Sequence, residues 1–123
     1  MGWLHYHGRF DVCKLIVENV DNKNPVYKNG FTPLYVAAKK GHFDICKLIL
    51  ENVDDKNPAT NNGFTPLYIA AKKGHFDICK LIIDRVDDKN PASKNGITPL
   101  YWAAHKGNFD ICKLIVESVD DKN

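Results

Sequence analysis

The sequence lacks the short motifs that mark most enzymes. It has no glycine-rich phosphate-binding loop, no His-Glu-x-x-His pair and no Gly-x-Ser-x-Gly segment. The aspartate-rich segment at residues 53–57, VDDKN, has neither the glycine nor the distal glutamate of an EF-hand loop. We therefore expect no catalytic residue and no cofactor. We interpret the aspartate pairs as capping or turn residues, and His42 and His75 as local hydrogen-bonding groups.

Long apolar runs and a strong charge of one sign are also missing. No run approaches the ~18 apolar residues of a membrane span, and the first residues have neither a basic leader nor an apolar signal core. The formal net charge is +2, from 17 basic and 15 acidic residues, so the overall charge does not argue for nucleic acid or a membrane surface. A chain of 123 residues with 44% apolar residues can form one domain with a core.

Cys-x-x-Cys pairs are absent, and the four cysteines recur every 33 residues, at Cys13, Cys46, Cys79 and Cys112. If these segments stack as neighbouring helices, adjacent cysteines lie about 8–10 Å apart, beyond the ~7 Å limit between Cα atoms for a disulfide. We expect free thiols that pack as small apolar side chains and bind no metal. Free thiols favour an intracellular, cytoplasmic protein.

The 33-residue spacing governs the whole chain. Gly8, Gly41, Gly74 and Gly107 keep it, and a second series of glycines at 30, 63 and 96 does the same. Residues 27–59 and 60–92 differ at only six positions. A fixed period of this length predicts stacked units. The predicted units are a partial repeat at 1–26, full repeats at 27–59 and 60–92, and a C-terminal repeat at 93–123.

Each unit is predicted to contain two short helices and a turn. Thr32 before Pro33 is a typical helix start, and Gly41 is expected to end that helix in a left-handed conformation. The second helix, at 43–51, has so wide an apolar surface that it needs cover from more than one side. Asn62-Gly63 predicts a tight turn in a projecting hairpin.

The repeated segment Gly-Phe-Thr-Pro-Leu-Tyr-x-Ala-Ala-Lys-Lys-Gly-His-Phe-Asp-Ile-Cys-Lys-Leu-Ile resembles the ankyrin repeat, fully over 27–123 and partly over 1–26. The resemblance implies an all-α repeat solenoid, L-shaped in section, in which helix-turn-helix pairs are linked by β-hairpin-like loops. It also implies a non-catalytic protein-protein interaction module that binds through its hairpin tips and the concave face of its first helices.

Two departures from the family pattern matter. Tyr35, Tyr68 and Tyr101 stand where the family usually has histidine, which puts in doubt an inter-repeat hydrogen bond that this histidine normally makes. The second helix is followed by VDDKNP, where the family usually has Gly-Ala-Asp-Val-Asn. Valine disfavours positive φ, so we expect either that Asn52 takes the left-handed position or that Val53 is strained. Arg85 replaces the asparagine in the next repeat, so this explanation is incomplete.

The candidate partner surface combines the hairpins with the ends of the first helices. Lysine-rich pairs end each first helix, apolar residues precede each Thr-Pro at the hairpin bases, and a third set is expected at the hairpin tips. The predicted residues are Tyr27, Lys28, Phe31, Lys39, Lys40, Thr60, Asn61, Phe64, Lys72, Lys73, Ser93, Lys94, Ile97, His105 and Lys106. Basic groups beside exposed aromatics suit an acidic protein partner with an apolar anchor.

Other interpretations stay open at this point. The lysines equally fit a solvated helix end, where they are favourable near the helix C-terminus. The near-identity of two repeats is compatible with a structural spacer, or a recombinant or designed repeat fragment, without a specific partner. Nucleic-acid binding by the lysine row is the weakest of the three.

The ends of the repeat array raise the possibility of self-association. Residues 1–8 hold only the end of a first helix, and the last second helix, from Phe109, is as apolar as the internal copies. Terminal repeats usually carry a polar outer face. We therefore predict an exposed apolar flank and either a longer array or self-association through the uncapped ends. Trp102, which replaces Val36 and Ile69 of the other repeats, is expected to cover part of that end.

Overall fold

A computed structural model describes residues 10–120 of the chain. Its helices are α1 Phe10–Asn19, α2 Pro33–Lys40, α3 Phe43–Leu50, α4 Pro66–Lys73, α5 Phe76–Ile83, α6 Pro99–His105 and α7 Phe109–Asp120, with a 3-10 turn, η2, at Lys28–Gly30. No strand is assigned in this range. The predicted all-α repeat solenoid is confirmed. None of the described helices is long and apolar enough to cross a membrane.

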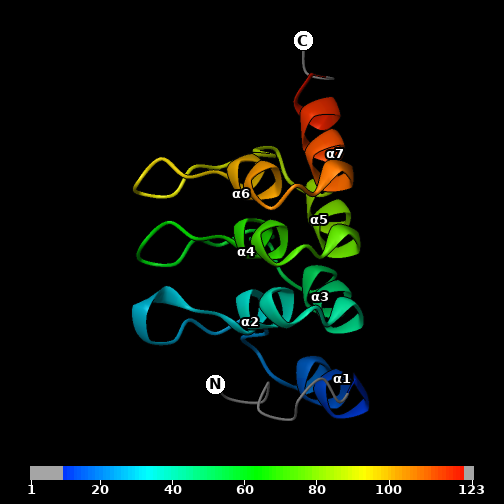
Figure 1. Ribbon diagram of the computed structural model, residues 1–123. Helices are drawn as coiled ribbons and strands as arrows, with labels where there is room; N and C mark the ends of the chain where they lie inside the picture. Colours follow the sequence, from blue (N-terminus) through cyan, green and yellow to red (C-terminus); the bar gives the residue numbers. More distant parts are fainter. Residues whose placement is uncertain (1–9, 121–123) are drawn as a thin grey trace.

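The helices form two parallel columns. Figure 1 shows α2, α4 and α6 stacked in one column and α1, α3, α5 and α7 in the other, with three hairpin loops projecting from the first column. Within each column every helix contacts the next, and each pair α2–α3, α4–α5 and α6–α7 packs together. This arrangement places the ends of all three first helices on one side of the molecule.

The first helices begin and end as predicted. Thr32, Thr65 and Thr98 are N-caps whose hydroxyl oxygens accept the backbone N–H of the residue three positions later, with proline at the first helical position. Gly41 ends α2 at φ 80° and donates its N–H to the carbonyls of Ala37 and Ala38. The cap geometry repeats in α4 with Gly74.

One continuous apolar core runs through the stack. Ala37, Ala38, Ala70 and Ala71 are fully buried where the first helices touch, because their small side chains allow close approach of the helix axes. The second helices contribute larger side chains, among them Ile45 and Ile49 of α3 and their equivalents in α5 and α7, all fully or almost fully buried. Each helix pair therefore depends on its neighbours to cover its apolar surface.

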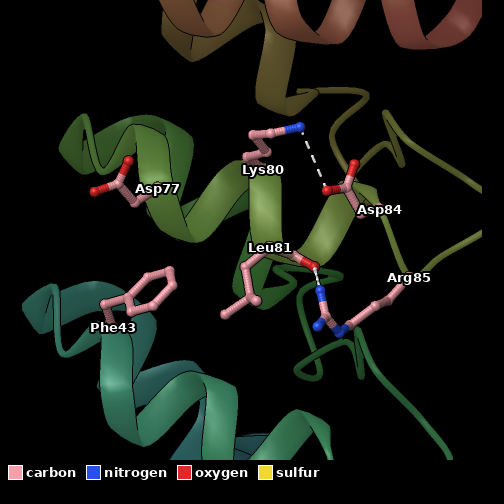
Figure 2. Close-up of a pocket in the computed structure, with 6 residues that line it drawn as sticks. All are labelled: Phe43, Asp77, Lys80, Leu81, Asp84 and Arg85. Carbon is pink, nitrogen blue, oxygen red and sulfur yellow. Dashed lines mark hydrogen bonds and ion pairs between the residues drawn. The ribbon is translucent and has the colours of Figure 1, made fainter.

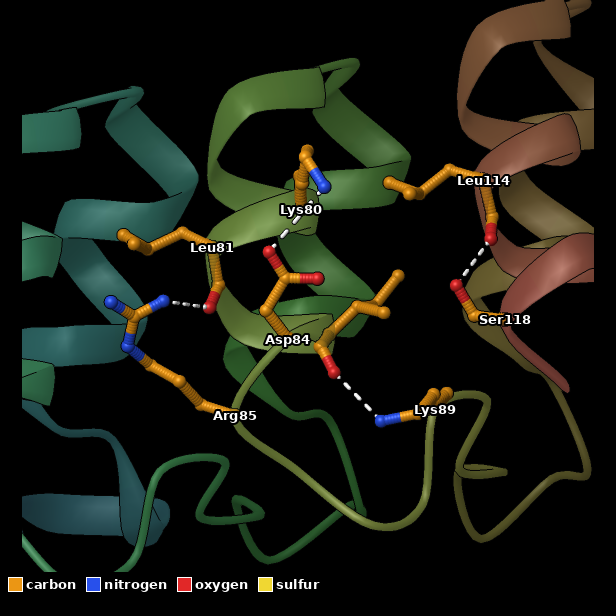
Figure 3. Close-up of polar contacts among 8 residues, drawn as sticks. Lys80, Leu81, Asp84, Arg85, Lys89, Leu114 and Ser118 are labelled. Atoms are coloured by element: carbon orange, nitrogen blue, oxygen red, sulfur yellow. Dashed lines mark hydrogen bonds and ion pairs between the residues drawn. The ribbon is translucent and has the colours of Figure 1, made fainter. Parts of the chain in front are cut away.

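The second helices end differently from our prediction. Neither Asn52 nor Val53 has a positive φ, since Asn29 is the one non-glycine residue among 10–120 that does. The last residues instead bond through side chains to carbonyls that the helix leaves without a partner. Asn52 Nδ2 donates to Leu48 O at 2.7 Å. Arg85 Nη1 makes the equivalent bond to Leu81 O after α5, whereas Ser118 Oγ donates to Leu114 O inside α7, which continues to Asp120 (Figure 3).

Side chains of the VDDKN segment cap the end of the second helix before it and the start of the first helix after it. Lys56 Nζ reaches back to Leu50 O at 2.8 Å and also contacts Val53 O, and Lys89 repeats both bonds after α5. Asn57 Oδ1 accepts the N–H of Leu67 at 3.0 Å, so this side chain satisfies an N–H in the first turn of the next first helix. Asp55 Oδ1 accepts the N–H of Asn57 at 3.2 Å, and Asp88 Oδ1 accepts that of Asn90 at 3.1 Å, which confirms the predicted turn role for the second aspartate of these two pairs.

The hairpin loops are held by short-range bonds and by each other. In the central hairpin Thr60 N–H donates to Phe64 O at 2.8 Å and Gly63 N–H donates to Thr60 O at 2.9 Å, with Gly63 at φ 82°. Adjacent hairpins are joined where Asn61 N–H donates to Asn29 O at 2.9 Å, and a bond from Lys94 to Asn62 repeats this link. The three loops thus form one continuous surface.

Candidate functional site

The structure places the predicted basic residues in a row at the ends of the first helices. Five of them, Lys39, Lys40, Lys73, His105 and Lys106, are exposed, and Lys72 is half-buried. They are lined up because α2 contacts α4 and α4 contacts α6. The row crosses the three repeats on the side where each first helix ends.

A histidine ties neighbouring repeats together beneath this row. His75 Nε2 lies 3.1 Å from the carbonyl oxygen of Lys39, one repeat earlier in the chain. The imidazole also covers Gly41, where a Cβ would come within 2.8 Å of the ring. The chain therefore has an inter-repeat side-chain hydrogen bond although tyrosine replaces the family histidine after Thr-Pro-Leu. His75 is a hydrogen-bonding group as predicted, but the prediction of a local bond is corrected, because its partner lies in another repeat.

Tyr35 and Tyr68 are buried and pack on the phenylalanines at the hairpin bases. Phe31 and Tyr35 meet edge to face with ring centroids 5.0 Å apart, and Phe64 stacks on Tyr68 at 4.6 Å. Burial, with Tyr68 as a neighbour, raises the pKa of Tyr35 to about 12. Both phenylalanines, and Ile97 in the third repeat, lie half-buried against the core. These predicted anchors are at the hairpin bases, but much of their surface is already used in packing.

Two of the residues expected at the hairpin tips lie elsewhere. Thr60 and Ser93 are buried, and their hydroxyl oxygens accept the backbone N–H groups of Phe64 and Ile97. The prediction that they are exposed tip residues is corrected, because the turn folds back over them. Tyr27, the equivalent residue in the first hairpin, is half-buried. The exposed loop residues from the predicted set are Lys28, Asn61 and Lys94.

An aromatic cluster at the C-terminal end of the row was missed by the sequence analysis as a binding feature. Trp102 lies edge-on to Tyr68 and Tyr101, with centroids 6.3 and 5.3 Å away, and His105 stacks on Tyr101 at 5.7 Å. Lys72 Nζ sits 4.5 Å above the centroid of the Trp102 ring. The available signal was Trp102 itself, a large aromatic residue where the other repeats have valine or isoleucine.

Trp102 also has an unusual polar environment. Its indole Nε1 is buried without a hydrogen-bond partner among the described residues, although the side chain as a whole is half-buried. A buried donor without a partner usually costs about 1–3 kcal/mol. The contacts with Tyr68 in the preceding repeat agree with the expected structural role of Trp102 at this end.

The cysteines are free, and three of them are fully buried. Burial raises the pKa of the Cys46 and Cys79 thiols to about 12, so both stay protonated at neutral pH and are poor nucleophiles. Within the part of the chain that the structure describes, no group of three His, Cys, Asp or Glu side chains could hold a metal ion. The open hollow between α3 and α5 in Figure 2 contains one ion pair, Lys80 with Asp84 at 3.4 Å, which is exposed.

Comparison with known families agrees with this architecture. A family model described as ankyrin repeats in three copies matches residues 3–92 and again 53–123. The chain belongs to the ankyrin repeat family. A search of curated proteins gave no significant match. Ankyrin repeats are generally protein-interaction modules and are typically non-catalytic, so the exposed row and the aromatic cluster are the surfaces to consider for partner binding.

Proposed function

We propose that this ankyrin repeat chain binds an acidic protein partner across the hairpins and the ends of the first helices. The observation that carries the proposal is the row of exposed basic side chains that leads to the aromatic cluster of Tyr101, Trp102 and His105. Aromatic groups and buried charges tend to dominate protein interfaces, while surrounding charges set orientation and association rate.

The packing at the hairpin bases changes where we place the apolar anchor of the partner. Phe31, Phe64 and Ile97 keep only part of their surface free. Tyr101 is one of the large exposed apolar side chains and stacks with His105 at the end of the basic row. We therefore assign the apolar contact to the C-terminal repeat and the charge contacts to the lysines of all three repeats. The free thiols favour a partner inside the cell.

A peptide selection tests this assignment without a known partner. Random peptides displayed on phage and selected on the wild-type chain should become rich in aspartate and glutamate, with one large apolar residue. Their affinity should fall about tenfold for Lys40→Glu combined with Lys73→Glu, because two attractive charge contacts become repulsive. The matched control is Lys47→Glu with Lys80→Glu, the same charge change on exposed residues of the second helices.

The comparison of the two variants decides the outcome. Peptides that bind both variants equally well, or that lack acidic residues, would show that the basic row is only a solvated helix end. Failure to enrich any peptide would favour the spacer interpretation. Binding to labelled DNA or RNA that weakens steeply with salt, and is lost in the Lys40 and Lys73 variant, would instead assign the row to nucleic acid.

A further inference from the structure

Neighbouring second helices meet at a joint that recurs along the stack. Phe43 of α3 and Leu81 of α5 line one hollow of about 260 Å³, shown in Figure 2. Phe76 of α5 and Leu114 of α7 line the next one, of about 220 Å³. Figure 3 shows Leu81 pointing towards α3 and Leu114 pointing towards α5. In each joint the phenylalanine comes from the earlier helix and the leucine from the later one.

The first and last described helices of this column each expose one of the two apolar residues of the joint, the leucine on α1 and the phenylalanine on α7. Leu48 and Leu81 are 9% and 7% exposed, whereas the equivalent Leu15 of α1 is 64% exposed. Phe43 and Phe76 are both 37% exposed, whereas Phe109 of α7 is 72% exposed. Within residues 10–120, the first helix of this column therefore leaves its leucine exposed and the last helix leaves its phenylalanine exposed.

The residues around these halves also match the internal joint. The joint between α5 and α7 is lined on the α7 side by Asp110, Lys113, Leu114 and Glu117. At the same spacing α1 carries Asp11, Lys14, Leu15 and Glu18. On the receiving side, Phe76 and Lys80 of α5 correspond to Phe109 and Lys113 of α7. The outer face of α1 therefore carries the same residue types that α7 presents to α5. The outer face of α7 carries the phenylalanine and lysine that α5 presents to α7.

We propose that copies of this chain associate head to tail, with α1 of one copy packed on α7 of the next. The joint would be completed by Leu15 of one copy and Phe109 of the other. A second copy is the fitting occupant because the chain itself supplies both complementary halves, in the order found twice inside the stack. Such a contact is heterologous and does not close on itself, so it produces linear oligomers of increasing length. The joint lies in the column of second helices, apart from the basic row.

The test compares blocked ends by light scattering during gel filtration. The average mass of the wild-type chain should rise steadily with concentration and pass the mass of two chains. Leu15→Asp alone and Phe109→Asp alone should each remain at the mass of one chain, because every contact needs both halves. Val26→Asp is the matched control, since Val26 is 71% exposed but lies in neither half. Circular dichroism should show the same helical content for all variants.

Mixing the two blocked variants gives the decisive result. The Leu15→Asp chain keeps its α7 half and the Phe109→Asp chain keeps its α1 half, so the mixture should form one dimer and grow no further. Self-association of Leu15→Asp alone would overturn the proposal in favour of a contact between two C-terminal ends. A wild-type chain that stays at the mass of one chain at millimolar concentration would overturn it as well. The exposed faces of α1 and α7 would then bind something other than a second copy.

Discussion

Residues 60–92 and the repeat that begins at residue 93 carry nearly the same pattern in different surroundings. Tyr68 is 5% exposed and Tyr101 is 47% exposed, although both follow Thr-Pro-Leu. Cys79 is fully buried, and Cys112 is half-buried. Within residues 10–120, α4 and α5 have helices on both sides of the stack, whereas α6 and α7 pack on α4, α5 and each other.

This difference shows that burial in the array is set by the neighbouring repeats. The same side chain contributes to the core in one repeat and to the surface in the next. The stability of each repeat therefore depends largely on its contacts with the neighbouring repeats. The end repeat also differs in sequence where it touches the preceding one. Trp102 replaces Ile69 and covers part of Tyr68, while Val116, in the position of the buried Ile83, remains exposed. The predicted exposed apolar flank is confirmed on α7 at Phe109 and Val116.

Truncating equivalent leucines should give the largest difference in stability between the two repeats. Leu67 is fully buried and Leu100 only half-buried. Leu67→Ala should lower the free energy of unfolding by about 3 kcal/mol, and Leu100→Ala by about half as much, because less contact is lost and the site can relax. Urea unfolding followed by circular dichroism measures both. Equal losses would mean that the end repeat is covered as well as the interior one.

Substituting equivalent glycines by alanine should give a smaller difference in the free energy of unfolding between the two repeats. Gly63 and Gly96 have positive φ angles of 82° and 79°, so alanine is strained at both. A Cβ on Gly63 would also lie 2.9 Å from the backbone nitrogen of Lys94, whereas a Cβ on Gly96 would meet nothing within 4 Å. We expect a loss of about 2–3 kcal/mol for Gly63→Ala and about 1 kcal/mol for Gly96→Ala in the same assay. A Gly96→Ala loss that matches Gly63→Ala would contradict the open environment of the last hairpin.

The local features of the fold were predictable because they depend on neighbours in sequence. Thr32 caps α2, Pro33 begins it and Gly41 ends it, each through atoms within a few residues. The end of α3 was predicted wrongly because its caps come from farther away. Lys56 reaches back six residues, and a positive φ is unnecessary once side chains satisfy the free carbonyls.

The surface was less predictable because it is created by stacking. One difference is local: we predict Thr60 at a hairpin tip, but its own hairpin turns back so that the Thr60 hydroxyl oxygen accepts the backbone N–H of Phe64. The cluster around Trp102 needs Tyr68 and Lys72 from the preceding repeat. A sequence shows the spacing of such residues and does not show which rings meet across two repeats.

The buried thiols of Cys46 and Cys79 predict a decline of stability in alkaline solution. Burial raises the pKa of Cys46 and Cys79 from 9.0 to about 12. Above pH 9 the unfolded chain ionises these thiols while the folded chain does not, so their contribution is present below pH 9 and is lost as the pH rises towards 12. Between pH 8 and 9.5 each thiol should lower the free energy of unfolding by about 1 kcal/mol. Urea unfolding across this range, with Cys46→Ala and Cys79→Ala together as the comparison, should show a clearly flatter pH dependence for the variant. A slope that the double substitution leaves unchanged would mean that the interior thiols are not the groups responsible.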